Sequence, residues 1–314
     1  MSPPDAVFFF SDYGLRDEFV GVVHSAIHRS APHVTVVDLT HGLQPFDVRG
    51  GGWMLARVLP RLGPGVVLGV VDPGVGTGRR GVVVQVPDET GHRWLVGPDN
   101  GLLMAAADAA GPVELAVELG SPARWPGRWA ERSGTLGRDP HATGESGGAA
   151  GEDPAARRQW SGPVSFDGRD LFAPAAAALC RGASPDDVGT RFDPATLVRL
   201  PPPVDERGFL PDGRRCVRTE VTAVDRFGNV KTSVAVDHAL AASLPLESRV
   251  EVVPGRPAGG GPVGVRAVRT FADLDGGELG VMADADGHLS LVEREGSAAM
   301  VLDLGVGDLL DLWW

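Results

Sequence analysis

An aspartate with an arginine seven residues later is the first feature of this sequence that could do chemistry. Asp72 follows the strand-like run 66–71, and a Pro-Gly turn separates it from Arg79 and Arg80. In open α/β sheets, ligands bind at the carboxyl ends of the strands. A carboxylate there can accept a proton, and a nearby guanidinium can keep it charged. The same residues could also be a turn cap and two surface charges, so this segment alone does not decide the matter.

Polar turns of similar composition recur along the chain. Each one is ordinary turn chemistry by itself, and a lone histidine such as His41 is more often structural than catalytic. Their joint occurrence is what favours a functional interpretation. They are Ser11-Asp12-Tyr13-Gly14, Asp38-Leu39-Thr40-His41-Gly42, Pro98-Asp99-Asn100-Gly101, Phe166-Asp167-Gly168-Arg169-Asp170 and Asp225-Arg226-Phe227-Gly228-Asn229.

Two nucleotide-binding motifs are excluded by their context. The glycine-rich segment 74–78 follows a strand-like run, but Arg79 stands where a dinucleotide fingerprint needs its third glycine. A strand-like run follows it rather than a helix that would hold a pyrophosphate. A phosphate-binding loop is excluded as well, because Val230 stands before Lys231 where that motif needs glycine.

The elements that must position these residues alternate through the first two thirds of the chain. Apolar runs at 7–10, 34–39, 66–71 and 82–86 alternate with helical patterns at 18–30, 48–61 and 102–110. This alternation predicts an α/β domain with a central, mostly parallel sheet and flanking helices. Pro174 suits the first turn of a further helix at 173–181.

The pattern of apolar and turn residues changes after three consecutive prolines at 201–203. Short β-type runs joined by turns follow, and Asp286-Gly287 between two of them is a strong hairpin signal. We therefore predict an α/β domain at 1–204 and a smaller all-β, barrel-like domain at 205–314. Residues 133–159 are rich in glycine, alanine, proline and charge, which predicts a disordered insert.

Composition excludes several classes of protein. The 314 residues are 43% hydrophobic, enough for a large core, and the net charge of −12 comes without a basic stripe, so nucleic acid is not an expected partner. Two cysteines without metal-ligand spacing predict neither a disulfide scaffold nor a zinc site. No run approaches a membrane span or a signal peptide. We expect a cytoplasmic protein.

In this order, the polar turns resemble the motifs of the S-adenosyl-L-methionine (SAM) hydroxide adenosyltransferases, relatives of the fluorinases and chlorinases. The likeness runs from about residue 8 to residue 311 and is interrupted at the insert. It implies an N-terminal α/β domain, a C-terminal β-barrel and a homotrimer with sites between subunits. It also implies hydrolysis of SAM by water at the ribose C5′, giving adenosine and methionine, with no metal or organic cofactor.

The resemblance also implies roles for individual residues. Asp12 would bind the ribose hydroxyls, Phe46 would pack near the sugar or methionine, and Phe166 would lie against the nucleoside. Asp225 and Asn229 would hold the methionine amine and carboxylate from the neighbouring subunit.

The implied catalytic set departs from the family at one position. The family's hydrolases orient the attacking water with an aspartate, an arginine and a histidine, which correspond here to Asp72, Arg79 and Asp167. A carboxylate can also accept a proton, so we predict a modified water-activating set. Two alternatives remain: a SAM- or adenosine-binding protein impaired in catalysis by this change, and a halogenase. The halogenases carry tyrosine at the position of Asp72, which disfavours the second.

Overall fold

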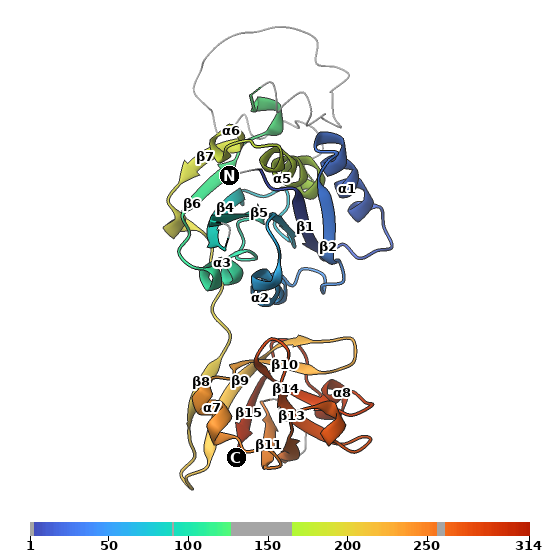
Figure 1. Ribbon diagram of the computed structural model, residues 1–314, viewed down its shortest axis with the longest axis vertical. Coiled ribbons are helices and arrows are strands. Elements are labelled where there is room, and N and C mark those ends of the chain that lie inside the picture. Colours follow the sequence, from blue (N-terminus) through green and yellow to red (C-terminus); the bar gives the residue numbers. More distant parts are fainter. Residues whose placement is uncertain (1–2, 90, 127–164, 256–260) are drawn as a thin grey trace. The chain divides into compact units, whose positions relative to one another are not determined.

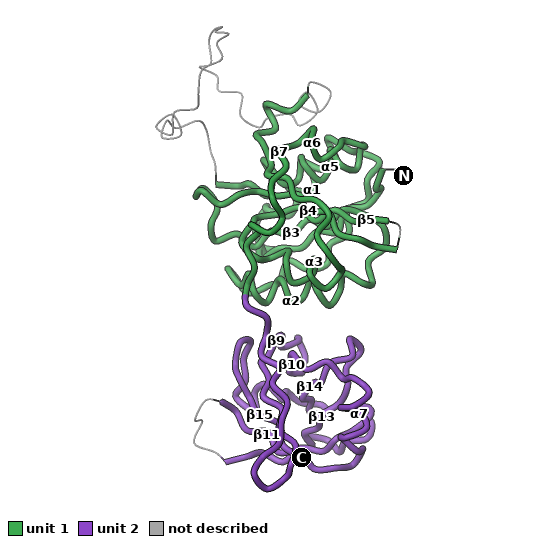
Figure 2. Tube along the Cα trace, turned by 90° about the vertical axis from the view of Figure 1, so that its left-hand side faces the viewer, with its two compact units in different colours: residues 1–200 green, residues 201–314 purple. Residues whose placement is uncertain are grey.

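The structure is a computed structural model that describes residues 3–89, 91–126, 165–255 and 261–314. Its chain divides into two compact units, Met1–Leu200 and Pro201–Trp314 (Figure 2). The division lies at the proline-rich segment that suggested the domain boundary in the sequence. The predicted insert at 133–159 lies outside the described residues.

The first unit is built on a seven-stranded sheet with the order β2-β1-β3-β5-β4-β6-β7. The four strands at one side of this order run parallel to one another, and the other three are joined by antiparallel pairings. This agrees with the α/β architecture predicted from the sequence. The strands are β1 (Ala6–Ser11), β2 (Thr35–Thr40), β3 (Val66–Val70), β4 (Gly81–Asp88), β5 (Gly91–Pro98), β6 (Leu115–Leu119) and β7 (Gly189–Phe192).

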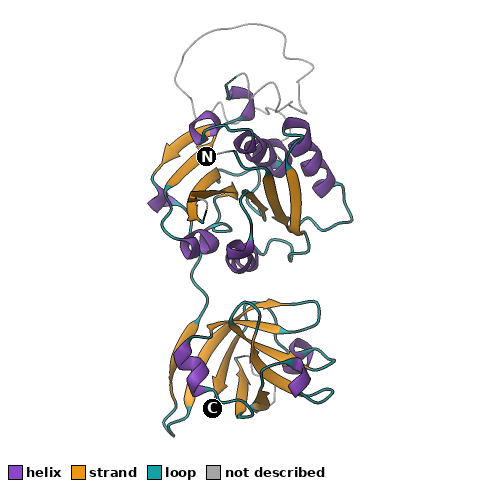
Figure 3. Ribbon diagram, viewed as in Figure 1, coloured by secondary structure: helices purple, strands orange, loops and turns teal. Residues whose placement is uncertain are grey.

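Helices cover both faces of this sheet, as Figures 1 and 3 show. Helices α1 (Phe19–Ser30) and α5 (Ala173–Cys180) pack on one face, and α2 (Val48–Val58) and α3 (Met104–Ala110) pack on the other. Strand β1 joins the two layers, because Phe9 belongs to the first core and Phe10 to the second. That alternation is the two-residue period of a strand buried on both faces. This packing on both faces fixes the ends of the strands between the two layers of helices.

Three strands of this unit lack a clear sequence signal. β5 carries the polar pair His92 and Arg93 directly after its first residue, Gly91, and β6 is short and carries Glu118. β7 is a polar edge strand that pairs only through β6 in the described sheet. Tertiary pairing, rather than local propensity, places all three.

The second unit is a closed barrel. Its strands follow the order β10-β14-β13-β12-β11-β15-β9-β8, and a further pairing of β10 with β9 closes seven of them into a ring. β8 adds to the outside edge of β9. This confirms the barrel-like prediction. The strands are β8 (Asp205–Phe209), β9 (Arg215–Val224), β10 (Val230–Ala235), β11 (Arg249–Pro254), β12 (Val263–Ala267), β13 (Leu279–Ala283), β14 (His288–Glu293) and β15 (Leu309–Trp313), with short helices α7 (His238–Ser243) and α8 (Ala298–Leu302).

The Asp286-Gly287 pair joins β13 to β14 in an antiparallel hairpin, as the sequence predicts. Gly287 has φ +78°, a left-handed conformation that glycine adopts without steric cost. Across the described residues, no helix combines the length and the apolar composition that crossing a bilayer requires.

Candidate functional site

The predicted polar turns of the first unit gather at one edge of its sheet. The four parallel strands β2, β1, β3 and β5 end at Thr40, Ser11, Val70 and Pro98, and a polar turn follows each end. Because parallel strands share one carboxyl edge, the turns come together there, where ligands of such sheets bind.

An ion-paired cluster of three side chains lies at this edge. Arg79 donates from Nε to Asp72 Oδ1 at 2.9 Å and from Nη2 to Asp72 Oδ2, a two-point pairing. Arg79 Nη2 also donates to Asp167 Oδ2 at 2.6 Å, across 88 residues of sequence. The side chains are 7%, 11% and 23% exposed for Asp72, Arg79 and Asp167, respectively. The structure thus brings together all three residues of the predicted catalytic set, largely shielded from solvent.

The turn 98–101 and its neighbours hold the segment that carries Asp72 and Arg79. Asn100 Nδ2 donates to the carbonyl of Val71 at 2.8 Å, directly before Asp72. Directly after Arg79, Arg80 Nε donates to Asp99 Oδ2 at 2.8 Å, and its guanidinium lies 4.1 Å from the Phe192 ring centroid. These contacts fix both ends of the segment, so Asn100 and Arg80 position the cluster without belonging to it.

Asp167 reaches the cluster from the π-helical turn η4 (Gly168–Phe172), which it precedes. Burial raises the pKa of the Asp167 carboxyl despite the opposing effect of Arg79, and the charges of Asp72 and Asp170 add to the rise. A raised carboxyl pKa makes the ionised form a stronger base. Asp167 is therefore suited to accept a proton.

Tyr13 is a residue at this site that sequence reasoning missed. Burial first, and then the carboxylates of Asp12, Asp72 and Asp167, raise the pKa of Tyr13, so its hydroxyl stays protonated. A Cβ atom at Gly168 would lie 2.2 Å from the Tyr13 hydroxyl oxygen. Glycine at that position is what lets the phenol approach the turn. The signal in the sequence was a tyrosine inside a polar turn, which local pattern alone does not distinguish from a core residue.

Asp12 and Phe46, which the resemblance places at the ribose and near the sugar or methionine, lie together. Asp12 Oδ2 accepts a hydrogen bond from the Phe46 backbone amide at 2.8 Å. Phe46 is 71% exposed and has φ +68°, an uncommon backbone conformation for a residue with a side chain. Strained backbone of this kind gathers at ligand-binding positions. The Asp12 carboxylate thus holds the backbone of an exposed aromatic residue.

Phe166 belongs to an aromatic group beside the cluster. Its ring makes edge contacts with Tyr13 and Phe19, at centroid distances of 5.6 and 5.3 Å, and the Arg169 guanidinium lies 5.0 Å from its centroid. Edge-to-face packing holds a ring in a defined orientation. This group offers an apolar wall next to the charged cluster.

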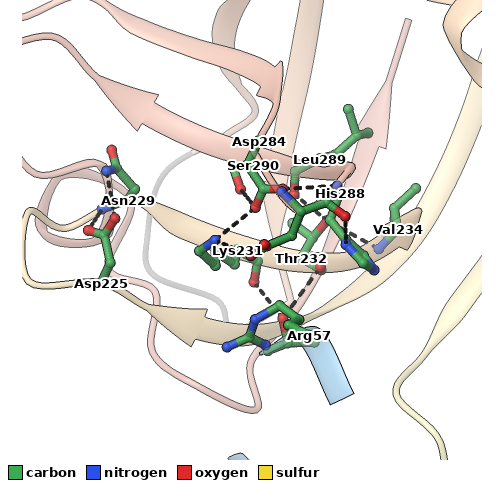
Figure 4. Close-up of polar contacts among 12 residues, drawn as sticks. Arg57, Asp225, Asn229, Lys231, Thr232, Val234, Asp284, His288, Leu289 and Ser290 are labelled. Atoms are coloured by element: carbon green, nitrogen blue, oxygen red, sulfur yellow. Dashed lines mark hydrogen bonds and ion pairs between the residues drawn. The ribbon is translucent and has the colours of Figure 1, made fainter. Parts of the chain in front are cut away.

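The remaining predicted residues, Asp225 and Asn229, lie together in the second unit. Figure 4 shows them in the turn between β9 and β10, where Asn229 Nδ2 donates to Asp225 Oδ2 at 2.8 Å. Asp225 Oδ1 accepts from the amides of Phe227 and Asn229, at 2.9 and 3.0 Å. Asp225 therefore organises its own turn and presents Asn229.

A cavity of about 1110 Å³ opens beside this turn and is lined by both residues. The only lysine of the sequence, Lys231, also lines it. Lys231 pairs with Asp284 at 3.1 Å (Figure 4) and with Asp286 at 2.9 Å. Ser290 Oγ donates to the same Asp284 oxygen at 3.0 Å. The second unit thus carries a cavity of its own in which charged and polar side chains lie beside an apolar lining, and Lys231 is a lining residue that sequence reasoning did not select.

Comparison with known proteins assigns both units. Residues 7–189 match the family model described as the SAM hydroxide adenosyltransferase N-terminal domain, and residues 219–311 match that of the C-terminal domain. The chain is 39% identical to the (R)-S-adenosyl-L-methionine hydrolase of Salinispora tropica, covering 99% of this chain and 98% of the relative. It is 27% identical to a fluorinase of Actinopolyspora mzabensis, covering 96% and 94%. A crystal structure of an uncharacterized conserved protein from Thermotoga maritima has a TM-score of 0.76 and 29% identity, covering 98% and 99%.

Proposed function

The chain belongs to the SAM hydroxide adenosyltransferase family, and we propose that it hydrolyses SAM to adenosine and L-methionine. Relatives that bear the name of SAM hydrolase align over nearly the full length of both chains, so both units of the fold are shared with them. The net charge of −12 suits a substrate that carries a sulfonium cation.

One observation carries the proposal of mechanism: Arg79 joins Asp72 and Asp167 in a shielded cluster at the carboxyl edge of the sheet. We propose that this cluster holds the attacking water in line with the C5′–S bond. The water oxygen forms a bond to C5′, the C5′–S bond breaks, and its electron pair goes to sulfur, which leaves as neutral methionine thioether. The water's proton passes to a carboxylate, for which Asp167, with its raised pKa, is the better acceptor.

The roles of the other residues are proposed on the same basis. Asp12 binds the ribose hydroxyls, Phe46 packs near the sugar or methionine, and Phe166 lies against the nucleoside. The exposure of Phe46 and the aromatic group around Phe166 support these assignments. Asp225 and Asn229 bind the amine and carboxylate of methionine, which their position at the cavity of the second unit supports.

We propose further that the protein is a cytoplasmic homotrimer in which the sites lie between subunits. The domain limits proposed are 1–204 and 205–314. The proposed reaction uses side chains and water alone, without a metal or an organic cofactor. We also propose that neither nucleic acid nor a membrane is a partner.

The direct test is to incubate the purified protein with SAM in water enriched in oxygen-18 and to separate the products by chromatography with mass detection. We expect adenosine and methionine in equal amounts, with the heavy oxygen on adenosine. Adenosine no higher than in a reaction without enzyme would refute the proposal.

A binding protein without turnover is the second candidate, because a carboxylate paired to Arg79 occupies the position of the family's histidine. Calorimetry that showed saturable SAM binding by a protein giving no product would select it. Repeating the product assay with chloride or fluoride addresses the halogenase alternative, since a halide nucleophile would yield a 5′-halogenated nucleoside instead.

A further inference from the structure

A second cluster of potential ligands lies on the first unit, outside the ion-paired cluster described above. His24 comes from α1, Asp38 from β2, and His41 from the turn after β2. Asp38 Oδ1 lies 2.8 Å from His24 Nε2 and 3.1 Å from His41 Nε2, and the three ligand atoms lie within 4.8 Å of one another. We propose that these three residues bind one divalent ion of the first transition row, such as Zn²⁺.

The orientation of His41 is the observation that points to an ion. Its side chain is 2% exposed, and Nε2 is buried without a well-directed hydrogen bond, although Asp38 Oδ1 is only 3.1 Å away. The oxygen therefore lies off the direction in which Nε2 projects. A buried ring nitrogen whose nearest acceptor is poorly directed is unfavourable, and proteins rarely leave one unsatisfied. An ion bound by Nε2 would satisfy it.

The other nitrogen of His41 is held as it is in metal-binding histidines. His41 Nδ1 lies 2.7 Å from Ser11 Oγ, and Ser11 is fully buried. When Nδ1 donates to that hydroxyl, Nε2 carries the free lone pair that a metal requires. The main chain is fixed too, because the His41 carbonyl accepts from the Gly14 amide at 2.7 Å. The ligand is thus oriented in advance through both its side chain and its backbone.

The ligand set selects the class of ion. Two imidazoles and one carboxylate suit Zn²⁺, Co²⁺ and Ni²⁺ rather than Ca²⁺ or Mg²⁺, which prefer oxygen ligands. The side chains of His24 and Asp38 are 35% and 39% exposed, so an ion has a path from solvent and water can complete its coordination. Phe9 packs against both imidazoles, with centroid distances of 6.1 Å to His24 and 4.6 Å to His41, and provides an apolar side.

The test is calorimetric titration of ZnCl₂ into untagged protein that has been stripped with a chelator and dialysed. We expect one Zn²⁺ per chain, and His24→Gln should weaken binding by at least roughly 10–100-fold, since losing even a residue that only orients a ligand costs that much. The matched control is His28→Gln, which removes an exposed histidine from the same helix and should leave the affinity unchanged. Both variants change surface positions, and their thermal unfolding without metal should match that of the parent.

A second readout uses Co²⁺, whose visible absorption reports coordination by nitrogen ligands. The parent and His28→Gln should show the bands, and His24→Gln should lose them. Absence of saturable binding, or equal binding by the parent and His24→Gln, would overturn the proposal. Because no step of this test contains SAM, its outcome is independent of whether the protein hydrolyses SAM.

Discussion

Asp72 is the residue on which the proposed hydrolysis most depends, because Arg79 binds it at two points and presents it at the edge of the sheet. Replacing Asp72 with Asn keeps the shape and removes the charge. We expect kcat for adenosine formation to fall by about 100-fold or more, because a small misplacement of the attacking water from the in-line geometry costs that much. Single-turnover kinetics with labelled SAM would measure the chemical step directly.

The control for that experiment is Asp186→Asn, which removes an exposed carboxylate paired with Arg191 at the surface of the same unit. It should retain the parent rate. If Asp72→Asn kept the parent rate as well, the cluster would not be the reaction centre.

Asp167 gives a prediction of pH dependence whose sign follows from its raised pKa. If the ionised carboxylate accepts the proton, kcat/KM must fall as the pH drops through that pKa, at a higher pH than for an ordinary carboxyl. Asp167→His should raise the pH at which kcat/KM falls still further, toward about 6.5, the ordinary pKa of histidine. A profile of kcat/KM against pH for both proteins measures the shift.

The stability of an Asp167 variant separates loss of chemistry from loss of fold. Because burial disfavours the charged carboxyl in the folded protein, its ionisation destabilises the fold as the pH rises through the interval between the ordinary and the raised pKa. Asp167→Asn should therefore unfold at the same or a higher temperature than the parent at neutral pH while losing activity. If the residual kcat/KM of Asp167→Asn still fell at the same low pH, the titrating group would be one other than Asp167.

At this scale the sequence predicts partners that are close along the chain better than distant ones. Asp72 and Arg79 are seven residues apart in one segment, so the sequence alone places them close together. Asp167 lies 88 residues from Arg79, and only the family resemblance links the two. Nothing local marks Tyr13, since its place beside Gly168 depends on how two separate segments pack.

The turn η4 depends on a close approach between Gly168 and Tyr13. In Gly168→Ala the new methyl group would collide with the Tyr13 hydroxyl, 2.2 Å away, so either the turn or the ring must move. Such overpacking costs about 1–3 kcal/mol of unfolding free energy. We expect a loss of that size by chemical denaturation, and lower activity because Asp167 directly precedes the turn.

A double variant identifies the cause. Tyr13→Phe removes the hydroxyl, so Gly168→Ala should cost less in the Tyr13→Phe background than alone, a coupling that a double-mutant cycle measures. Additive effects of the two changes would mean that the collision is relieved elsewhere.

Elements with strong apolar periodicity were predictable from the sequence, and elements defined by their pairing were not. β1 and β3 are continuous apolar runs, which the sequence predicts at 7–10 and 66–71. β8 carries three charged residues in five, because it only adds an outer edge to β9. Its position follows from a neighbour, which a local pattern does not contain.

The whole molecule divides the proposed site between two units. The first unit holds the ion-paired cluster with Asp12 and Phe46, and the second holds Asp225 and Asn229 beside a cavity. Each set is well ordered by contacts within its own unit. If, as we propose, one binding site needs both sets and takes its halves from neighbouring subunits, activity requires assembly.

Mixed trimers test this assembly. One variant, Asp72→Asn, damages the first unit, and the other, Asn229→Ala, damages the second, so each alone should be inactive or nearly so. When both are expressed together in equal amounts, a site formed between neighbouring subunits is intact if it takes its first unit from one variant and its second unit from the other. When the two variants combine at random in closed trimers, each half of a site is undamaged half of the time, so about one quarter of all sites are intact.

Purification through two different tags keeps only mixed trimers, in each of which one site of three is intact, so this protein should recover roughly a third of the parent activity per site if assembly is closed. The two variants purified separately and combined without subunit exchange provide the background. Light scattering on the same sample should give three chains per particle. Sites built within one chain would give no recovery, because every chain in the mixture carries one damaged half.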